Sequence, residues 1–216
     1  MAPAASAPHT LENGIPYSVK LTIDHDWIKP FNDNGVRLIM AKVFKDAAGN
    51  ETFNVVASAQ DVTGDMTARW EDNYQICGST DTFKSGQVIS GISGLLDIGF
   101  QQTYVLNDWS NYFIQNDTAV PKTSFGFKNG VIASAVVQLN IDGQFSPIYM
   151  SPYKFPPGKA TLRPLPKVVF WFQADLESST MITMDVSNSI TVDLSQSTTA
   201  ALTYDKKGQW QQVPGS

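Results

Sequence analysis

The sequence predicts an all-β fold, a single-domain sandwich of two antiparallel sheets of the immunoglobulin-like or jelly-roll-like kind. Residues 182–194 alternate almost perfectly between apolar and polar side chains, which is typical of a strand with one face against a core. The same rhythm recurs in short runs, separated by turn residues, along most of the chain. No window of about a dozen residues keeps a helical period with caps. These three observations favour an all-β class over a helical or mixed one.

Several strands are predicted in the first half of the chain, each an alternating or apolar run bounded by turn residues. They are residues 17–23, 36–44, 53–59, 66–76, 87–92, 95–100, 103–106 and 111–115. Residues 46–50 have the length of a hairpin loop, so they predict an antiparallel pair formed by the strands on either side.

Two turn signals organise the second half. The dipeptide Asn129-Gly130 tolerates positive φ at both positions, so it predicts a type I′ turn that joins residues 124–127 to 131–141. Asp142-Gly143 predicts a second turn of this type.

A long proline-rich connection precedes the last predicted strands. Residues 151–166 contain five of the 12 prolines, and proline cannot donate to a sheet ladder, so no central strand is expected there. Residues 168–173 form an apolar run typical of a strand buried on both faces. The strands at 182–194 and 199–204 follow. Two residues of the apolar run, Val169 and Trp171, and two of the alternating strand, Ile190 and Val192, are predicted to lie in the core.

Length and composition set the domain organisation. The chain has 216 residues, 42% of them hydrophobic and 16% charged, as expected for a folded protein. Residues 1–14 are predicted to be a flexible arm and residues 15–216 a single domain. Two strands after the proline-rich stretch are too few to stand alone, so they should return to the main sheets.

Charge and hydropathy restrict the partners. A net charge of −5 without a Lys/Arg cluster argues against nucleic acid and against anionic membrane surfaces. No run approaches the roughly 18 apolar residues of a membrane-spanning helix, so no constitutive membrane insertion is expected. The first eight residues lack the regions of a signal peptide. A cytoplasmic protein is therefore expected, with leaderless release as the alternative.

Catalytic motifs are scarce in this sequence. It has two histidines, His9 and His25, and Gly91-Ile92-Ser93-Gly94 lacks the spacing of a nucleophile elbow. Cys77, the single cysteine, ends an alternating strand and is interpreted as a small core residue. No phosphate-binding glycine loop or zinc spacing is present. A non-catalytic protein without a cofactor is favoured, and an enzyme that uses a pair of carboxylates is left open.

The densest polar cluster is Asp24-His25-Asp26, followed by a run from Asn32 to Gly35. If the strand at 17–23 continues through Asp26, the side chains of Asp24 and Asp26 lie on the same face of it. Carboxylate and amide oxygens suit Ca²⁺, so one hypothesis is a calcium site with four ligands: Asp24, Asp26, Asn32 and Asn34. The spacing matches no loop with a fixed ligand rule, which favours the alternative that these residues only end a strand and form a turn.

Residues 107–113 mix aromatic and polar side chains in one short run. A flat aromatic ring can cover the apolar face of a sugar, while carboxylate and amide groups bond its hydroxyls. The candidate carbohydrate-type site consists of Asp108, Trp109, Asn111 and Tyr112. Tyr149, Tyr153 and Phe155 could form a second aromatic surface, whereas Trp70, Tyr74 and Trp171 are assigned to the core.

The function favoured by these patterns is recognition of a glycan or small molecule by a lectin-like module, or self-association into a homo-oligomer. One alternative is a β-pore-forming cytolysin. The Ser/Thr-rich residues 177–204 would then insert as a barrel hairpin with apolar side chains toward lipid.

Overall fold

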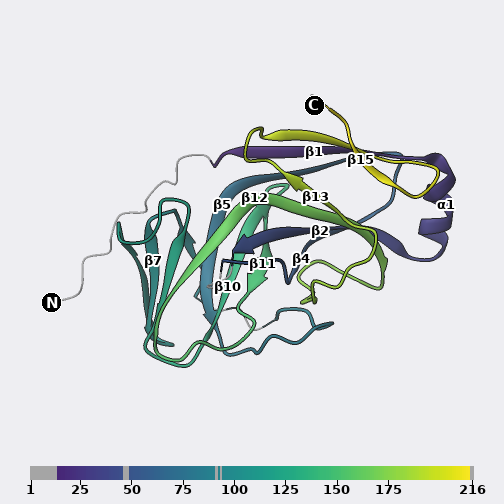
Figure 1. Ribbon diagram of the computed structural model, residues 1–216. Helices are drawn as coiled ribbons and strands as arrows, with labels where there is room; N and C mark the ends of the chain where they lie inside the picture. Colours follow the sequence, from purple (N-terminus) through teal and green to yellow (C-terminus); the bar gives the residue numbers. More distant parts are fainter. Residues whose placement is uncertain (1–13, 46–48, 91, 93, 215–216) are drawn as a thin grey trace.

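Two β-sheets pack face to face (Figure 1), which confirms the predicted all-β two-sheet sandwich. The computed structural model describes residues 14–45, 49–90, 92 and 94–214. The predicted arm, apart from its last residue, therefore lies outside the described residues. Side chains from both sheets contribute to one large apolar cluster.

The first sheet has seven strands among the described residues. They are β1 (Pro16–Ile23), β5 (Asp65–Ser79), β6 (Leu96–Ile98), β10 (Ser134–Ile141), β11 (Gln144–Met150), β14 (Thr199–Tyr204) and β15 (Trp210–Gln212). Their order is β11-β10-β5-β1-β14-β15, with β6 beside β5. β1 and β14 run parallel, and the other pairs are antiparallel.

The second sheet has eight strands in the part of the chain that the structure describes. They are β2 (Val36–Lys45), β3 (Glu51–Thr52), β4 (Val56–Asp61), β7 (Gln102–Asp108), β8 (Asn111–Asn116), β9 (Phe125–Asn129), β12 (Gly158–Ala174) and β13 (Ile190–Asp193). Their order is β3-β2-β12-β9-β7-β8, with β4 beside β2 and β13 beside β12. β7 and β9 are parallel. The prediction of two purely antiparallel sheets is therefore wrong in this detail, because each sheet contains one parallel pair.

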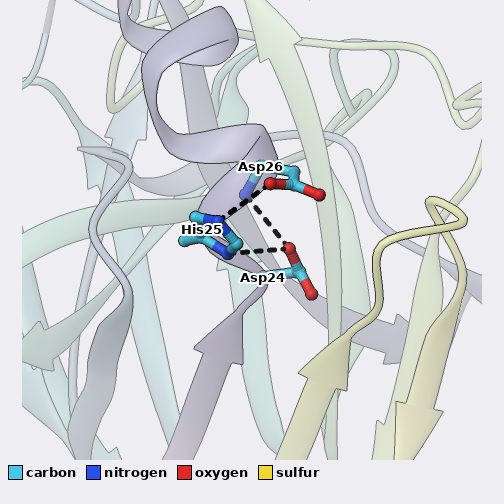
Figure 2. A group of neighbouring side chains, drawn as sticks. All are labelled: Asp24, His25 and Asp26. Atoms are coloured by element: carbon cyan, nitrogen blue, oxygen red, sulfur yellow. Dashed lines mark hydrogen bonds and ion pairs between the residues drawn. The ribbon is translucent and has the colours of Figure 1, made fainter.

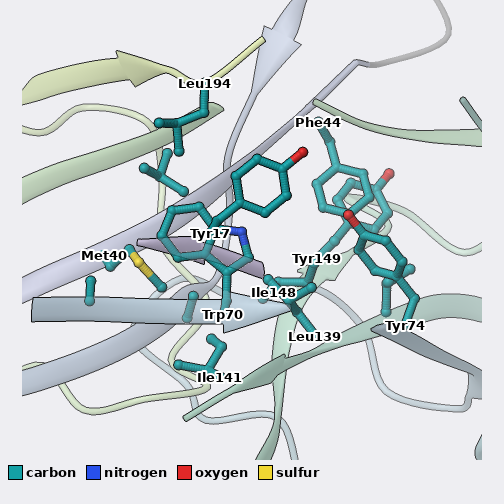
Figure 3. Packing of buried hydrophobic residues seen from close by; sticks show 14 of the residues in the cluster. Tyr17, Met40, Phe44, Trp70, Tyr74, Leu139, Ile141, Ile148, Tyr149 and Leu194 are labelled. Atoms are coloured by element: carbon teal, nitrogen blue, oxygen red, sulfur yellow. The ribbon is translucent and has the colours of Figure 1, made fainter. Parts of the chain in front are cut away.

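The apolar run in β12 is buried on both faces, as predicted. Val168 and Phe170 belong to the core between the sheets, whereas Val169 and Trp171 belong to a second cluster on the outer face of the eight-stranded sheet. Val192 is fully buried and Ile190 partly buried. Figure 3 shows the core between the sheets, which includes the predicted core residues Trp70 and Tyr74. Cys77 is buried, as expected.

The long strand predicted at residues 182–194 is wrong over most of its length, because only Ile190–Asp193 pairs as β13. Asn188 adopts a left-handed φ of 48°, which ends an extended run. Its amide donates hydrogen bonds to the Tyr204 hydroxyl and the Gly208 carbonyl. Met184 is half exposed. The segment proposed for insertion as a hairpin thus contributes β13 to one sheet and β14 to the other.

The turn predicted at Asn129-Gly130 does not form a hairpin, because β9 and β10 lie in different sheets. An ideal Cβ on Gly130 would lie 2.6 Å from the Asn107 carbonyl oxygen, so close backbone packing explains this glycine. By contrast, Asp142 and Gly143 have φ of 50° and 82° between β10 and β11. These values confirm the second predicted turn. The predicted pairing across residues 46–50 is also confirmed, since β2 pairs antiparallel with β3 and β4.

The proline-rich connection is shorter than predicted, because β12 begins at Gly158. Pro164 and Pro166 lie inside this central strand, contrary to expectation. The β2–β12 register shifts between Pro164 and Val168. At such a bulge a missing N–H removes no ladder hydrogen bond, which explains why the prolines are tolerated. Of the strand predicted at 87–92, the described residues form an isolated bridge between Val88 and Thr180.

One α-helix, α1 (His25–Asp33), lies at the end of β1 (Figure 1). Its Trp27 donates an indole hydrogen bond to the Asp205 carbonyl, and its Phe31 packs on Phe172 with ring centroids 4.6 Å apart. The helix therefore caps one end of the sandwich. No helix of the described chain combines the length and apolar character needed to cross a membrane.

Candidate functional site

The four residues of the predicted carbohydrate-type site lie together at the tip of the β7–β8 hairpin. Asp108 pairs with Asn111 across the turn. The Asp108 carboxylate accepts a hydrogen bond from the Ser110 N–H at 2.8 Å, which fixes the turn. The second carboxylate oxygen of Asp108 and the side-chain amide of Asn111 form no hydrogen bond with any described residue. The tip thus presents an acceptor and an amide to solvent.

Two aromatic rings flank this tip. Trp109 is 41% exposed and Tyr112 is 37% exposed. The Tyr112 ring stacks near Tyr104 and covers Gly94, where an added Cβ would lie 2.8 Å from the ring. The edge of the Trp109 indole lies near Gly78 of β5. Both rings therefore rest on β-sheet residues while part of each surface remains open, as an aromatic binding surface requires.

The candidate calcium ligands do not all meet. β1 ends at Ile23, and Asp24 caps α1 by accepting a hydrogen bond from the Asp26 N–H at 3.0 Å, so the strand does not continue through Asp26. Asn32 and Asn34 lie at the other end of the helix. Their amides donate to the Val62 and Pro30 carbonyls, respectively.

Asp24 and Asp26 gather instead around His25 (Figure 2). The His25 nitrogens lie 3.5 Å from the Asp24 carboxylate and 3.0 Å from the Asp26 carboxylate. Ligand atoms of all three residues lie within 4.8 Å of one another. This set has one nitrogen donor and two carboxylates, and it differs from the all-oxygen shell that Ca²⁺ prefers.

We expect the melting temperature to be equal in EDTA and in millimolar Ca²⁺. Capping by Asp24 and the contact of Asp26 with His25 already account for the carboxylates at the start of α1. A ligand that binds only the folded state would raise the melting temperature by mass action. A rise with Ca²⁺ that Asp26→Asn removes would contradict this expectation and assign a metal site to the helix start.

A second candidate site is an open groove of about 1060 Å³ beside the first part of β12, here called the β12 groove. Its lining includes residues 158–163, part of the preceding connection, and residues near the ends of β2 and β9. Tyr149, Tyr153 and Phe155 all line it. Tyr149 is buried and stacks on Phe44 in the core, whereas Tyr153 is exposed. The rings of Tyr153 and Phe155 meet edge to face, 5.6 Å apart.

Three cations line the β12 groove, and none of its described lining residues is acidic. Lys159 hydrogen-bonds the Asp117 carboxylate at 2.6 Å, which lowers the pKa of Asp117. Lys45 and Arg163 face each other across β2 and β12. Neither of them forms a salt bridge with any described carboxylate.

A buried cation, Lys42, lies in the core between the sheets. Its side chain is 1% exposed, and its Nζ lies 3.7 Å from the Asp72 carboxylate, too far for a hydrogen bond. The Nζ also lies 5.6 Å from the ring centroids of both Tyr17 and Trp70. Burial lowers the pKa of Lys42, and Asp72 opposes this shift. Figure 3 shows the two stacked rings.

Neither Lys42 nor the cations of the β12 groove are predicted as functional residues from the sequence. Lys42 carries a signal, because Leu38, Met40 and Phe44 share its inward face in one alternating strand. A lysine on such a face predicts a buried partner. Lys45 and Arg163 carry no such signal, since they are distant in the chain and meet only through strand pairing.

Fold and site together define an all-β sandwich with an exposed aromatic hairpin and a cationic groove. Comparison with protein-family models, with curated protein sequences and with solved structures gives no match. The function is therefore inferred from the geometry of the chain itself.

Proposed function

We propose that this protein is a non-catalytic, lectin-like module that binds a carbohydrate-type ligand at the β7–β8 tip. The observation that carries the proposal is the partial exposure of Trp109 beside two side chains with unused hydrogen-bonding groups. Trp109 stacks on the apolar face of a sugar ring, and Asp108 and Asn111 bond its hydroxyls. Tyr112 forms one wall of the site.

The position of the tip supports this role. A hairpin that extends from a sheet presents its turn to solvent on a rigid base. Contacts of Tyr112 with Tyr104 and Gly94 hold that ring in place before any ligand arrives. Preorganisation of this kind lowers the entropic cost of binding.

Self-association is the second candidate function, and a separate observation favours it. β8 ends the eight-stranded sheet, and no described strand pairs with its outer edge. Tyr112 and Phe113 are both partly exposed on this strand. An exposed apolar edge strand is a ready surface for pairing with a second copy.

Trp109→Ala should abolish binding to a glycan array while changing the free energy of unfolding by less than about 1 kcal/mol, because a partly exposed ring contributes little to the core. Phe145→Ala is the matched control, since this aromatic residue is also partly exposed, at 37%, but lies on β11. The control should bind glycans as the natural chain does.

Three outcomes would count against the site. One is an array on which the natural chain binds nothing, and another is equal glycan binding by Trp109→Ala. The third is a large loss of stability in that variant, which would make Trp109 structural. Analytical ultracentrifugation of the natural chain and of Phe113→Lys tests the second candidate, because a charge on the β8 edge should dissociate an edge-paired dimer.

A further inference from the structure

The first part of β12 has a strand edge that no described strand pairs with. β9 pairs with residues 158–162 on one side. On the other side β2 ends at Lys45, opposite Arg163, and no described strand continues along residues 158–162. These residues line the β12 groove. Backbone groups of an antiparallel strand alternate between its two edges, so some of them face the groove.

Like charges lie in register across both sides of β12. Lys45 lies directly opposite Arg163, and Lys159 lies directly opposite Lys128 of β9. Like charges at opposite positions of a sheet destabilise it. Lys159 and Arg163 are four residues apart, so they share one face of β12. Asp117 neutralises Lys159, but Lys45 and Arg163 have no ion-pair partner among the described carboxylates. These two charges favour an anionic partner at this face.

Lysine and proline also protect exposed strand edges from unwanted pairing. That role suits the β12 groove, whose walls include both residue types. The protection is selective, however, because a basic edge repels basic strands and attracts acidic ones.

We propose that the β12 groove binds an extended acidic peptide segment of a partner protein. The segment adds as a strand to the free edge of residues 158–162 and places its carboxylates beside Lys45 and Arg163. Main-chain hydrogen bonds supply affinity, and the charges supply specificity. Tyr153 and Phe155 contact the side chains on the apolar face of the segment. The groove shares no lining residue with the β7–β8 tip, so this proposal does not depend on the glycan-binding proposal.

The probe is a short labelled peptide of alternating glutamate and valine, measured by fluorescence anisotropy at low salt. The natural chain should bind it, and the lysine–valine counterpart should not bind. Affinity should fall by at least about tenfold in the double variant Lys45→Gln/Arg163→Gln and on raising the salt concentration. Lys206→Gln/Lys207→Gln is the matched control, with the same charge change at exposed lysines between β14 and β15. It should bind as the natural chain does.

A second peptide tests strand addition itself. Methylation of alternate backbone nitrogens keeps every carboxylate but removes the hydrogen bonds along one edge, so one of the two methylated registers should lose binding. Undiminished binding by both registers would overturn strand addition. Absence of binding by the parent peptide, or equal binding by Lys45→Gln/Arg163→Gln, would overturn the proposal as a whole. If polygalacturonate binds in the groove and the peptide does not, the proposal is also overturned as a whole. Trp109→Ala should bind the peptide normally, which separates this test from that of the glycan site.

Discussion

Asp72→Ala should lower the free energy of unfolding by about 3–5 kcal/mol, because it leaves the ammonium group of Lys42 buried without a counter-charge. Lys42 is 1% exposed and has Asp72 as its carboxylate partner. Asp72 also accepts a hydrogen bond from the Tyr74 hydroxyl at 2.9 Å. The substitution therefore removes a hydrogen bond within β5 as well as the ion pair that joins β5 to β2 of the other sheet. Urea unfolding at neutral pH measures the change.

The double variant Lys42→Met/Asp72→Asn is the control for this prediction. It replaces the ion pair by an apolar side chain of similar length and a neutral partner, so most of the stability should return. A cost below about 1 kcal/mol for Asp72→Ala would show that the pair is not required to hold Lys42 in the core.

The cost of Asp72→Ala should also shrink as the pH rises toward 9.5. Burial lowers the pKa of Lys42, and loss of Asp72 removes the interaction that opposes this shift. Between the lowered pKa and the ordinary value of 10.5, the unfolded chain binds more protons than the folded chain, so stability rises with pH. Above pH 10 the stability falls as the pH rises, because burial raises the pKa of Tyr74 well above 10.0 and the folded chain keeps this proton longer than the unfolded chain.

Trp171→Ala should cost about 3–5 kcal/mol, because it deletes a large side chain from the second apolar cluster. Trp171 is 1% exposed and lies 6.0 Å from Phe53, ring to ring. Ile182 and Leu176 from the segment before β13 belong to the same cluster. Loss of the indole should therefore also loosen that segment, seen as faster limited proteolysis between residues 175 and 189.

Trp171→Phe is the matched control, since a smaller aromatic ring keeps part of the packing and should lose less stability than alanine. Urea unfolding of both variants decides the outcome. A loss below about 1 kcal/mol for Trp171→Ala would contradict its assignment to the core.

The candidate site was predictable where its residues are close in the chain. Asp108, Trp109, Asn111 and Tyr112 meet because a hairpin turn joins their strands, and such a turn depends on local residues. Two of the four residues in the calcium hypothesis, Asn32 and Asn34, lie at the far end of α1. The helix was not predicted, because nine residues are too few to give a clear periodic signal. The β12 groove depends on pairing between distant segments, which no local pattern reveals.

By itself, the sequence determined the all-β class, the Asp142-Gly143 turn and the double burial of the strand at Val168–Trp171. These features follow from side-chain alternation and from φ preferences, which act within a few residues. Tertiary structure decided which sheet each strand joins, that β9 and β10 separate after Asn129, and that Lys45 meets Arg163. Such choices arise from the burial and pairing of residues far apart in the chain, where one alternating pattern fits many partners.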